Sequence, residues 1–313
     1  MNRRELLGLA LTAALAPAAE AARGAAALKA IQKHSGGRLG VHILDTQSGK
    51  RITLDDKSRY AMASTFKLAL AASLLWQVDK GAFPLVRSLP VDKGDLLPNS
   101  PIIAKAVETG VTQLTVRDLC GAAVAFSDNA AANILLKAMG GPDAFTQFMR
   151  SIGDETTRLD RFEPDLNSNL PGDERDTTTP YAMVESMLRI FTQDVLALGS
   201  RALLIDWMTA SKTGLDRVRR GLPKTWVSSD KTGTGPNGAF NDLVITWPLE
   251  RRPAEAESSR ATETERWNEE ILGSPEGRSR AERLVSFPSV PPTSQHRRVR
   301  TRPSVPRTHR RDA

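Results

Sequence analysis

Four short segments combine residue types that could do chemistry. In the first, Ser64 and Lys67 form an S-x-x-K pattern. A serine hydroxyl is a poor nucleophile until a base takes its proton, and residues three apart on a helix share a face, so this amine can reach that hydroxyl. At a helix N-terminus, free backbone N–H groups also face the site. Ser228 and Lys231 repeat the pattern, however, so it does not establish a nucleophile on its own.

The second segment, Ser127-Asp128-Asn129, offers a hydroxyl, a carboxylate and an amide in a row. It precedes an apolar run at helical spacing, residues 130–137. All three residue types are also favoured as helix N-caps, so a cap and a functional site are both consistent with the segment.

The third segment is Lys231-Thr232-Gly233-Thr234-Gly235. A strand that carries Lys and Thr, with glycines that let a ligand approach the backbone, suits a substrate with a carboxylate. The tripeptide also occurs at residues 212–214, but there it ends a helix. The strand-like residues around 231–235 favour the later copy.

The fourth segment contains Glu163 and Asn167, in a loop rich in Pro, Asp and Asn. A carboxylate and an amide four residues apart could hold a water molecule for general-base hydrolysis. A solvated acidic loop is the alternative reading of the same residues.

The elements that must position these segments follow from the apolar spacing. Alternation predicts strands at residues 39–45 and 51–54, and strand character returns at 226–227, 230–234 and 243–247, with turns between them. Helical spacing predicts helices within 25–34, 66–78, 116–126 and 130–139. We therefore expect an α/β fold of the α+β type: an antiparallel sheet from both chain ends (about 38–57 and 224–248), with helices packed on it and an inserted all-helical region (about 58–207).

Composition narrows the function. The 313 residues include 43 Lys and Arg against 36 Asp and Glu, but residues 249–313 alone hold 14 Arg, no Lys and 10 acids. The basicity therefore lies mainly in a tail, which argues against a folded nucleic-acid module. The single cysteine, Cys120, excludes an internal disulfide. The four histidines are scattered and show no metal-ligand spacing, which argues against a His-based zinc site. The sequence has no run of 18 apolar residues, so we expect no membrane span.

The two chain ends differ from the middle. Residues 1–21 carry Arg3-Arg4, an apolar run and a small-residue cleavage pattern, which predicts an export signal and permits a twin-arginine route. We expect the exported protein to be periplasmic or secreted. Residues 249–313 are rich in Arg, Pro and Ser and poor in apolar residues, which is typical of a disordered segment.

Together and in this order, S-x-x-K, S-D-N and K-T-G are the motif set of class A β-lactamases and penicillin-binding proteins. Residues 26–248 resemble a class A serine β-lactamase, also at Gly36–Val41, Ser127–Asn133, Pro171–Pro180 and Asn241-Asp242. The resemblance implies a serine hydrolase that opens the β-lactam ring through an acyl-enzyme, acts as a monomer and needs no metal or organic cofactor. Its substrate is a small-molecule β-lactam, and neither nucleic acid nor, after signal removal, membrane is a partner.

The resemblance also implies roles for individual residues. Ser64 matches the nucleophile, Lys67 its neighbouring amine, and Glu163 with Asn167 the pair that holds the deacylating water. Ser127, backed by Lys231, matches the proton route to the lactam nitrogen. The positions that match substrate-binding residues are Asn129, Arg217, Thr232, Gly233 and Thr234. Arg161 and Asp176 match a structural ion pair that closes the loop carrying Glu163.

Two alternatives remain. A penicillin-binding peptidase shares Ser64, Lys67, Ser127 and Lys231 but does not need Glu163 and Asn167. A non-catalytic product is the other alternative, because family members have an apolar central strand and a closing helix where this chain has Ala254–Ser259 and the Arg-rich tail. The abrupt change in composition favours a shifted or rearranged reading frame after Pro253, and a natural divergent extension is the competing explanation.

Overall fold

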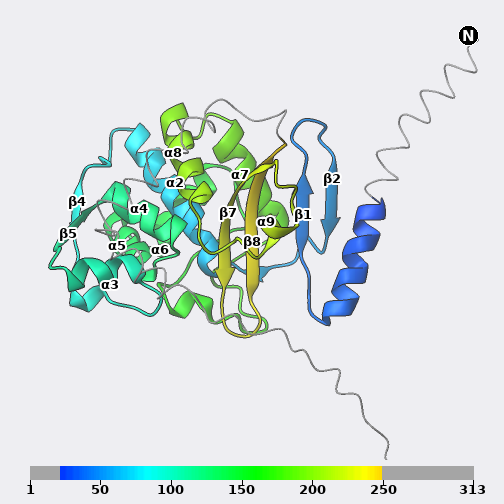
Figure 1. Cartoon of the computed structure of the whole chain (residues 1–313), viewed down its shortest axis with the longest axis horizontal. Helices are drawn as coiled ribbons and strands as arrows, with labels where there is room; N and C mark the ends of the chain where they lie inside the picture. The colour runs from blue at the N-terminus through cyan, green and yellow to red at the C-terminus, as the bar shows by residue number, and fades with distance from the viewer. Residues whose placement is uncertain (1–21, 249–313) are drawn as a thin grey trace, which may run out of the picture. The chain divides into compact units, whose positions relative to one another are not determined.

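The computed structural model describes residues 22–248 (Figure 1). The predicted export signal, residues 1–21, and the predicted disordered tail, residues 249–313, lie outside the described residues. Residues 22–35 form a helix that contains the predicted segment 25–34. No helix within 22–248 is long and apolar enough to cross a membrane.

The region 58–207 is predominantly helical, as predicted, but it is not all-helical, because four of the short strands given below lie within it. The α-helices that follow the first helix are α2 (Phe66–Asp79), α3 (Pro101–Glu108), α4 (Val116–Ala125), α5 (Asn129–Met139), α6 (Pro142–Ser151), α7 (Pro180–Thr192), α8 (Leu198–Thr209) and, beyond that region, α9 (Val218–Gly221). Three short 3₁₀ turns are η1 (Ala63–Thr65), η2 (Lys93–Asp95) and η3 (Asp165–Asn167). Helix α2 is buried from Phe66 to Leu75, because its sequence is apolar on nearly every side, and it contacts α4, α5, α6 and α8.

The sequence also accounts for where these helices begin and end. Thr115 and Asp118 form a reciprocal capping box at the start of α4, and Thr179 caps α7 just before Pro180. Helix α5 ends at Gly140, whose left-handed backbone (φ +107°) suits a residue without a Cβ.

The strands form antiparallel pairs. They are β1 (Val41–Leu44) with β2 (Arg51–Leu54), β3 (Tyr60–Ala61) with β6 (Thr177–Thr178), β4 (Ser88–Pro90) with β5 (Gln113–Thr115), and β7 (Val227–Thr234) with β8 (Phe240–Trp247). The two long hairpins were predicted. The ladders β3–β6 and β4–β5 were not, because segments of two or three residues show no alternation.

The predicted sheet from both chain ends is found as two hairpins within residues 22–248, since β1 pairs with β2 and β7 with β8 but the hairpins do not pair with each other. Figure 1 shows most of the helical region on one side of β7–β8 and the β1–β2 hairpin on the other. The strand that the family pattern expects after Pro253 falls outside the described residues.

Candidate active site

Ser64 lies in the turn η1, directly before α2, and is 8% exposed. The preceding Ala63 has a left-handed backbone (φ +44°). Strand β7 runs close beside this turn. If Gly233 carried a Cβ, that atom would lie only 2.6 Å from the Met62 carbonyl oxygen. Only glycine permits such an approach, which brings the β7 backbone to the Ser64 backbone. The Asn241 side chain on β8 holds the same turn by donating to the Met62 carbonyl at 3.1 Å.

Lys67, in the first turn of α2, is fully buried and connects four groups. Its Nζ donates to Ser64 Oγ at 2.9 Å and to Asn129 Oδ1 at 2.5 Å. It also donates to the Ser127 carbonyl at 2.8 Å and lies 3.0 Å from Glu163 Oε1. The predicted contact between the Lys67 amine and the Ser64 hydroxyl is therefore present. The Glu163 carboxylate, from a loop distant in the sequence, contacts the same amine.

In the Ser127–Asn129 segment, one residue caps a helix and another contacts a buried lysine. Asp128 is the N-cap of α5, since its Oδ1 accepts from the Ala131 N–H at 2.9 Å. Ser127 has a left-handed backbone (φ +58°), and its Oγ accepts from Lys231 Nζ at 3.1 Å. The cap interpretation therefore holds for Asp128, while Ser127 contacts the buried amine of Lys231. Asn99 adds support by donating to the Ser127 carbonyl at 3.0 Å.

Burial changes the acid–base properties of this centre. Removal from water lowers the pKa of Lys67, against the opposing attraction of Glu163. Burial lowers the pKa of Lys231 well below its usual value, and the nearby Lys67 lowers it further. Burial also raises the pKa of Asp128. Two lysines with depressed pKa values can take part in proton transfer near neutral pH more readily than solvated ones.

Glu163 is held at the site by its backbone and its side chain. Asn133 on α5 accepts from the Glu163 N–H at 3.0 Å and donates to the Glu163 carbonyl at 2.9 Å. Asn167 Nδ2 donates to Glu163 Oε2, and Glu163 Oε1 lies 3.5 Å from Ser64 Oγ. Asn167 Oδ1 is buried and has no hydrogen-bond partner among the described residues. The side chain that donates to the Glu163 carboxylate therefore also carries a buried acceptor without a partner among the described residues.

The loop that carries Glu163 is closed by the predicted ion pair. Arg161 Nε lies 2.6 Å from Asp176 Oδ2, and Asp176 is fully buried. Asp176 also accepts from the backbone N–H groups of Asp160 at 2.7 Å and of Arg161 at 3.0 Å. The carboxylate thus joins the two ends of the loop.

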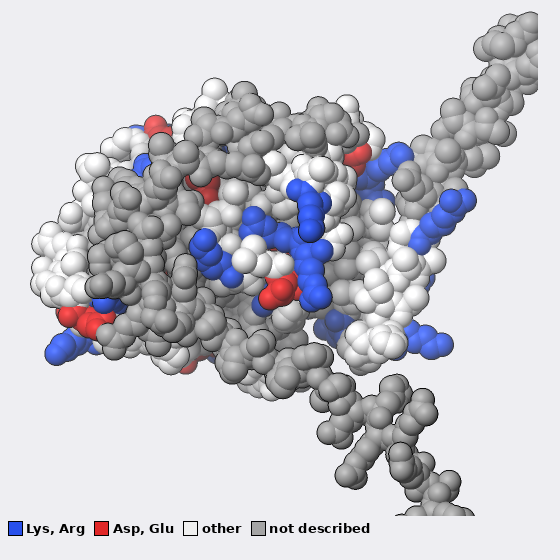
Figure 2. Space-filling model, viewed as in Figure 1, with Lys and Arg blue, Asp and Glu red and all other residues white. Residues whose placement is uncertain are grey.

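Donors gather at the C-terminal end of β7. Thr232 Oγ1 lies 2.6 Å from Thr213 Oγ1, and Arg217 Nη2 donates to Thr234 Oγ1 at 2.6 Å. The Arg217 guanidinium also lies 3.8 Å from the ring centre of Phe240. Figure 2 shows basic side chains gathered over α9 and the adjoining part of β8. This region therefore suits an anionic group.

The structure brings the predicted residues together from five elements: the η1 turn with α2, the start of α5, the 161–176 loop, β7, and the segment before α9. Sequence reasoning did not single out Asn133, although its spacing of four from Asn129 places both on one face of α5. It also missed Thr213, which belongs to the second K-T-G copy. That copy was expected to end a helix, but α8 ends at Thr209, and Thr213 lies in the following segment, where its Oγ1 contacts Thr232. Within residues 22–248 no group of three or more His, Cys, Asp or Glu side chains could hold a metal.

The Ser64 hydroxyl lies next to the buried amine of Lys67 and within 3.5 Å of the Glu163 carboxylate. Serine enzymes that transfer acyl groups place a base beside the hydroxyl in this way. Comparison with known proteins specifies the family. A sequence model described as "Beta-lactamase enzyme family" matches residues 23–255. Beta-lactamase L2 of Stenotrophomonas maltophilia is 44% identical over 238 residues, which are 76% of this chain and 78% of that protein.

Further relatives agree. Beta-lactamase CTX-M-97 of Escherichia coli is 43% identical over 226 residues, which are 72% of this chain and 77% of that protein. The structure of an ancestral (GNCA) class A beta-lactamase matches with TM-score 0.71 and 50% identity, over 74% of this chain and 87% of that one. A beta-lactamase from Desulfarculus baarsii matches with TM-score 0.72 and 44% identity, over 74% and 86% of the two chains. The chain belongs to the class A β-lactamase family.

Proposed function

We propose that this chain hydrolyses the amide bond of β-lactams through an acyl-enzyme on Ser64, and so confers resistance to these antibiotics. The observation that carries the proposal is the cluster around Lys67 Nζ, which lies 2.9 Å from Ser64 Oγ and 3.0 Å from Glu163 Oε1. Ser64 Oγ attacks the lactam carbonyl, and its proton passes to Lys67 or, through water, to Glu163. Both bases lie within reach of the hydroxyl.

The ring nitrogen needs a proton as the amide bond breaks. Ser127 supplies it in this proposal, and Lys231, whose Nζ lies 3.1 Å from Ser127 Oγ, restores it. Backbone N–H groups of Ser64 and Thr234 stabilise the oxyanion, which explains why β7 must approach the η1 turn so closely at Gly233. Thr232, Thr234 and Arg217 receive the substrate carboxylate, and Asn129 the carbonyl of the acylamino side chain.

Deacylation distinguishes a hydrolase from a penicillin-binding peptidase. Glu163 and Asn167 hold a water molecule that attacks the ester, with Glu163 as general base. The contact of Asn167 Nδ2 with Glu163, and the unpartnered Asn167 Oδ1 beside it, support this role. A peptidase that keeps its acyl group for another amine has no need of the pair.

The test is nitrocefin turnover by the purified full chain beside a Ser64→Ala variant. We expect turnover by the first and none by the second. No turnover by a chain that is soluble and unfolds cooperatively would contradict the proposal, because the site would then be present without the activity.

We also propose that residues 1–21 direct export and that the mature protein acts as a monomer in the periplasm or outside the cell. The charged, apolar and small-residue order of this segment supports the first part. N-terminal sequencing of the exported protein tests it. A mature chain that still begins at Met1 would contradict cleavage, and sedimentation as a dimer would contradict the monomer.

A further inference from the structure

An aromatic ring on the surface covers the cation at the C-terminal end of β7. Phe240, the first residue of β8, is 69% exposed. The guanidinium carbon of Arg217 lies 3.8 Å from the centre of its ring. A ring that stays in water gains little from burial, whereas its face attracts a cation at this distance. The contact with Arg217 therefore accounts for the position of the ring.

The pairing of β7 with β8 brings the ring and the cation together. Phe240 is the partner of Thr234 across the antiparallel ladder, and the side chains of directly opposed residues lie on the same face of a sheet. Arg217 Nη2 donates to Thr234 Oγ1 at 2.6 Å. The guanidinium thus contacts both members of one cross-strand pair, the hydroxyl by a hydrogen bond and the ring by its face.

The remaining bonds of Arg217 go to backbone carbonyls. Its Nη1 donates to the carbonyls of Gly233 at 3.2 Å and Asn241 at 2.5 Å. Within residues 22–248 no carboxylate oxygen lies within 4.0 Å of the guanidinium nitrogens, whereas the neighbouring Arg219 pairs with Asp230 at 2.8 Å. A guanidinium has five N–H groups, so these bonds leave both donors and the positive charge for an anionic ligand.

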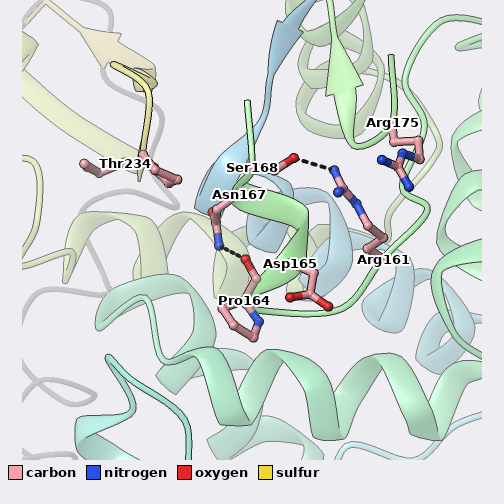
Figure 3. Close-up of a pocket in the computed structure, with 9 residues that line it drawn as sticks. Arg161, Pro164, Asp165, Asn167, Ser168, Arg175 and Thr234 are labelled. Carbon is pink, nitrogen blue, oxygen red and sulfur yellow. Dashed lines mark hydrogen bonds between the residues drawn. The ribbon is translucent and has the colours of Figure 1, made fainter. Parts of the chain in front are cut away.

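The contact of Arg217 with Thr234 places the guanidinium at the edge of a cavity. Thr234 lines this cavity of about 680 Å³ together with Asn167 and Ser168, and Figure 3 shows Thr234 across from these two residues. An anion bound at the Thr234 hydroxyl lies next to the guanidinium. The orientation of the guanidinium therefore decides how well it binds that anion.

We propose that Phe240 is a positioning residue, which holds the Arg217 guanidinium beside Thr234 for the substrate carboxylate. The inference rests on the proposed function, in which Arg217 and Thr234 receive that carboxylate. The ring covers one face of the guanidinium, while Thr234 and the two backbone carbonyls hold its edge. Without the ring, the long arginine side chain regains rotamers, and each substrate that binds must order it again. Phe240 touches neither the carboxylate nor the reacting atoms.

Three variants separate the ring from its size. Phe240→Leu keeps an apolar side chain but has no ring face for the cation, and Phe240→Tyr keeps that face. Tyr181→Leu is the matched control, because Tyr181 is also an exposed aromatic residue and its ring covers Lys57. It lies on α7, which contributes no residue to the site.

Benzylpenicillin and its methyl ester are the substrates, because they differ only in the negative charge of the carboxylate. In Phe240→Leu we expect the KM for benzylpenicillin to rise about fivefold, the upper end of what an exposed cation–π contact contributes. The kcat should stay within twofold of wild type, and Phe240→Tyr should restore the KM. The KM for the ester should not change in any variant, and Tyr181→Leu should alter no constant.

A double-mutant cycle shows whether the ring acts through the guanidinium. In an Arg217→Ala chain, Phe240→Leu should cause no further rise in the KM for benzylpenicillin. A further fivefold rise there would overturn the proposal, because the ring would then contact the substrate directly. An unchanged KM in Phe240→Leu, or equal rises for benzylpenicillin and the ester, would overturn it as well.

Nuclear magnetic resonance gives a readout that needs no activity. The face of an aromatic ring shifts nearby protons upfield, so the Arg217 Nε–H resonance should move downfield in Phe240→Leu and stay in place in Phe240→Tyr. Its absence from the spectrum of Arg217→Ala assigns it. A resonance that does not move in Phe240→Leu would overturn the stacking. If the wild-type chain hydrolysed no benzylpenicillin, the proposed function would fail and the role in carboxylate binding with it, but this resonance would still decide whether the ring holds the guanidinium.

Discussion

Replacing Asn133 by alanine should slow deacylation far more than acylation. Asn133 is 9% exposed and makes two hydrogen bonds to the backbone of Glu163, at 3.0 and 2.9 Å. Its loss leaves a buried N–H and a buried carbonyl without partners, at about 1–3 kcal/mol for each group. We take about 3 kcal/mol in total, because the two unpaired groups form some hydrogen bonds with water once the loop is displaced. That energy corresponds to roughly a 100-fold slower deacylation.

Stopped-flow measurement of acyl-enzyme formation and decay separates the two steps, and urea unfolding reports stability. Asn133→Asp keeps the acceptor for the Glu163 N–H but cannot donate to the carbonyl, so its deacylation rate should lie between those of the wild type and the alanine variant. Ser186→Ala removes a buried hydroxyl bonded to Asp154 at 2.7 Å, outside the site, and controls for lost stability alone. Deacylation within threefold of wild type in Asn133→Ala, or equal slowing by Ser186→Ala, would refute the reasoning.

Three further predictions concern the pH dependence of stability, the loop and the core. Burial, reinforced by the charge of Asp230, raises the pKa of Asp242 to about 6. The unfolded chain then binds fewer protons between about pH 4 and pH 6, so stability falls as pH rises through that window. Asp242→Asn should reduce this fall in urea midpoints, and an unchanged profile would exclude Asp242 as a source of it. Asp176→Asn leaves Arg161 without its closest carboxylate and should destabilise the fold by about 3 kcal/mol in the same assay; a midpoint equal to that of wild type would contradict this. Burial raises the pKa of the Cys120 thiol, so Ellman's reagent should label it only after unfolding, and rapid labelling of the native chain would contradict the packing of α4.

The elements with a regular spacing of apolar residues over several residues were predictable from the sequence. The β1–β2 hairpin and helix α2 extend over several residues of regular apolar spacing, and their observed bounds agree with the predicted ones to within a few residues. Strands β4 and β5 have only three residues each, too few for alternation to appear. The relation between the two long hairpins depends on pairing across the whole chain, which no local pattern encodes.

The candidate site divides in the same way. The spacing of Ser64 and Lys67 predicted their contact, because one helix turn determines it. The contact of Lys67 with Glu163 joins residues far apart in the sequence, and only the combined motifs and the family resemblance pointed to it. The bonds of Asn133 to the backbone of Glu163 were not predicted, although Asn133 ends a segment that carries the family resemblance. An asparagine that binds a distant backbone looks the same in sequence as one in a solvated loop.

The most direct test of the central claim is intact-protein mass spectrometry after mixing with benzylpenicillin. Glu163→Gln keeps the size of the side chain but removes the general base. We predict that this variant accumulates one penicilloyl group per chain, on the peptide that contains Ser64, while the wild type shows none after turnover. The double variant Ser64→Ala/Glu163→Gln should show none at any time. A Glu163→Gln variant that turns over as fast as wild type, or an adduct on another residue, would contradict the account.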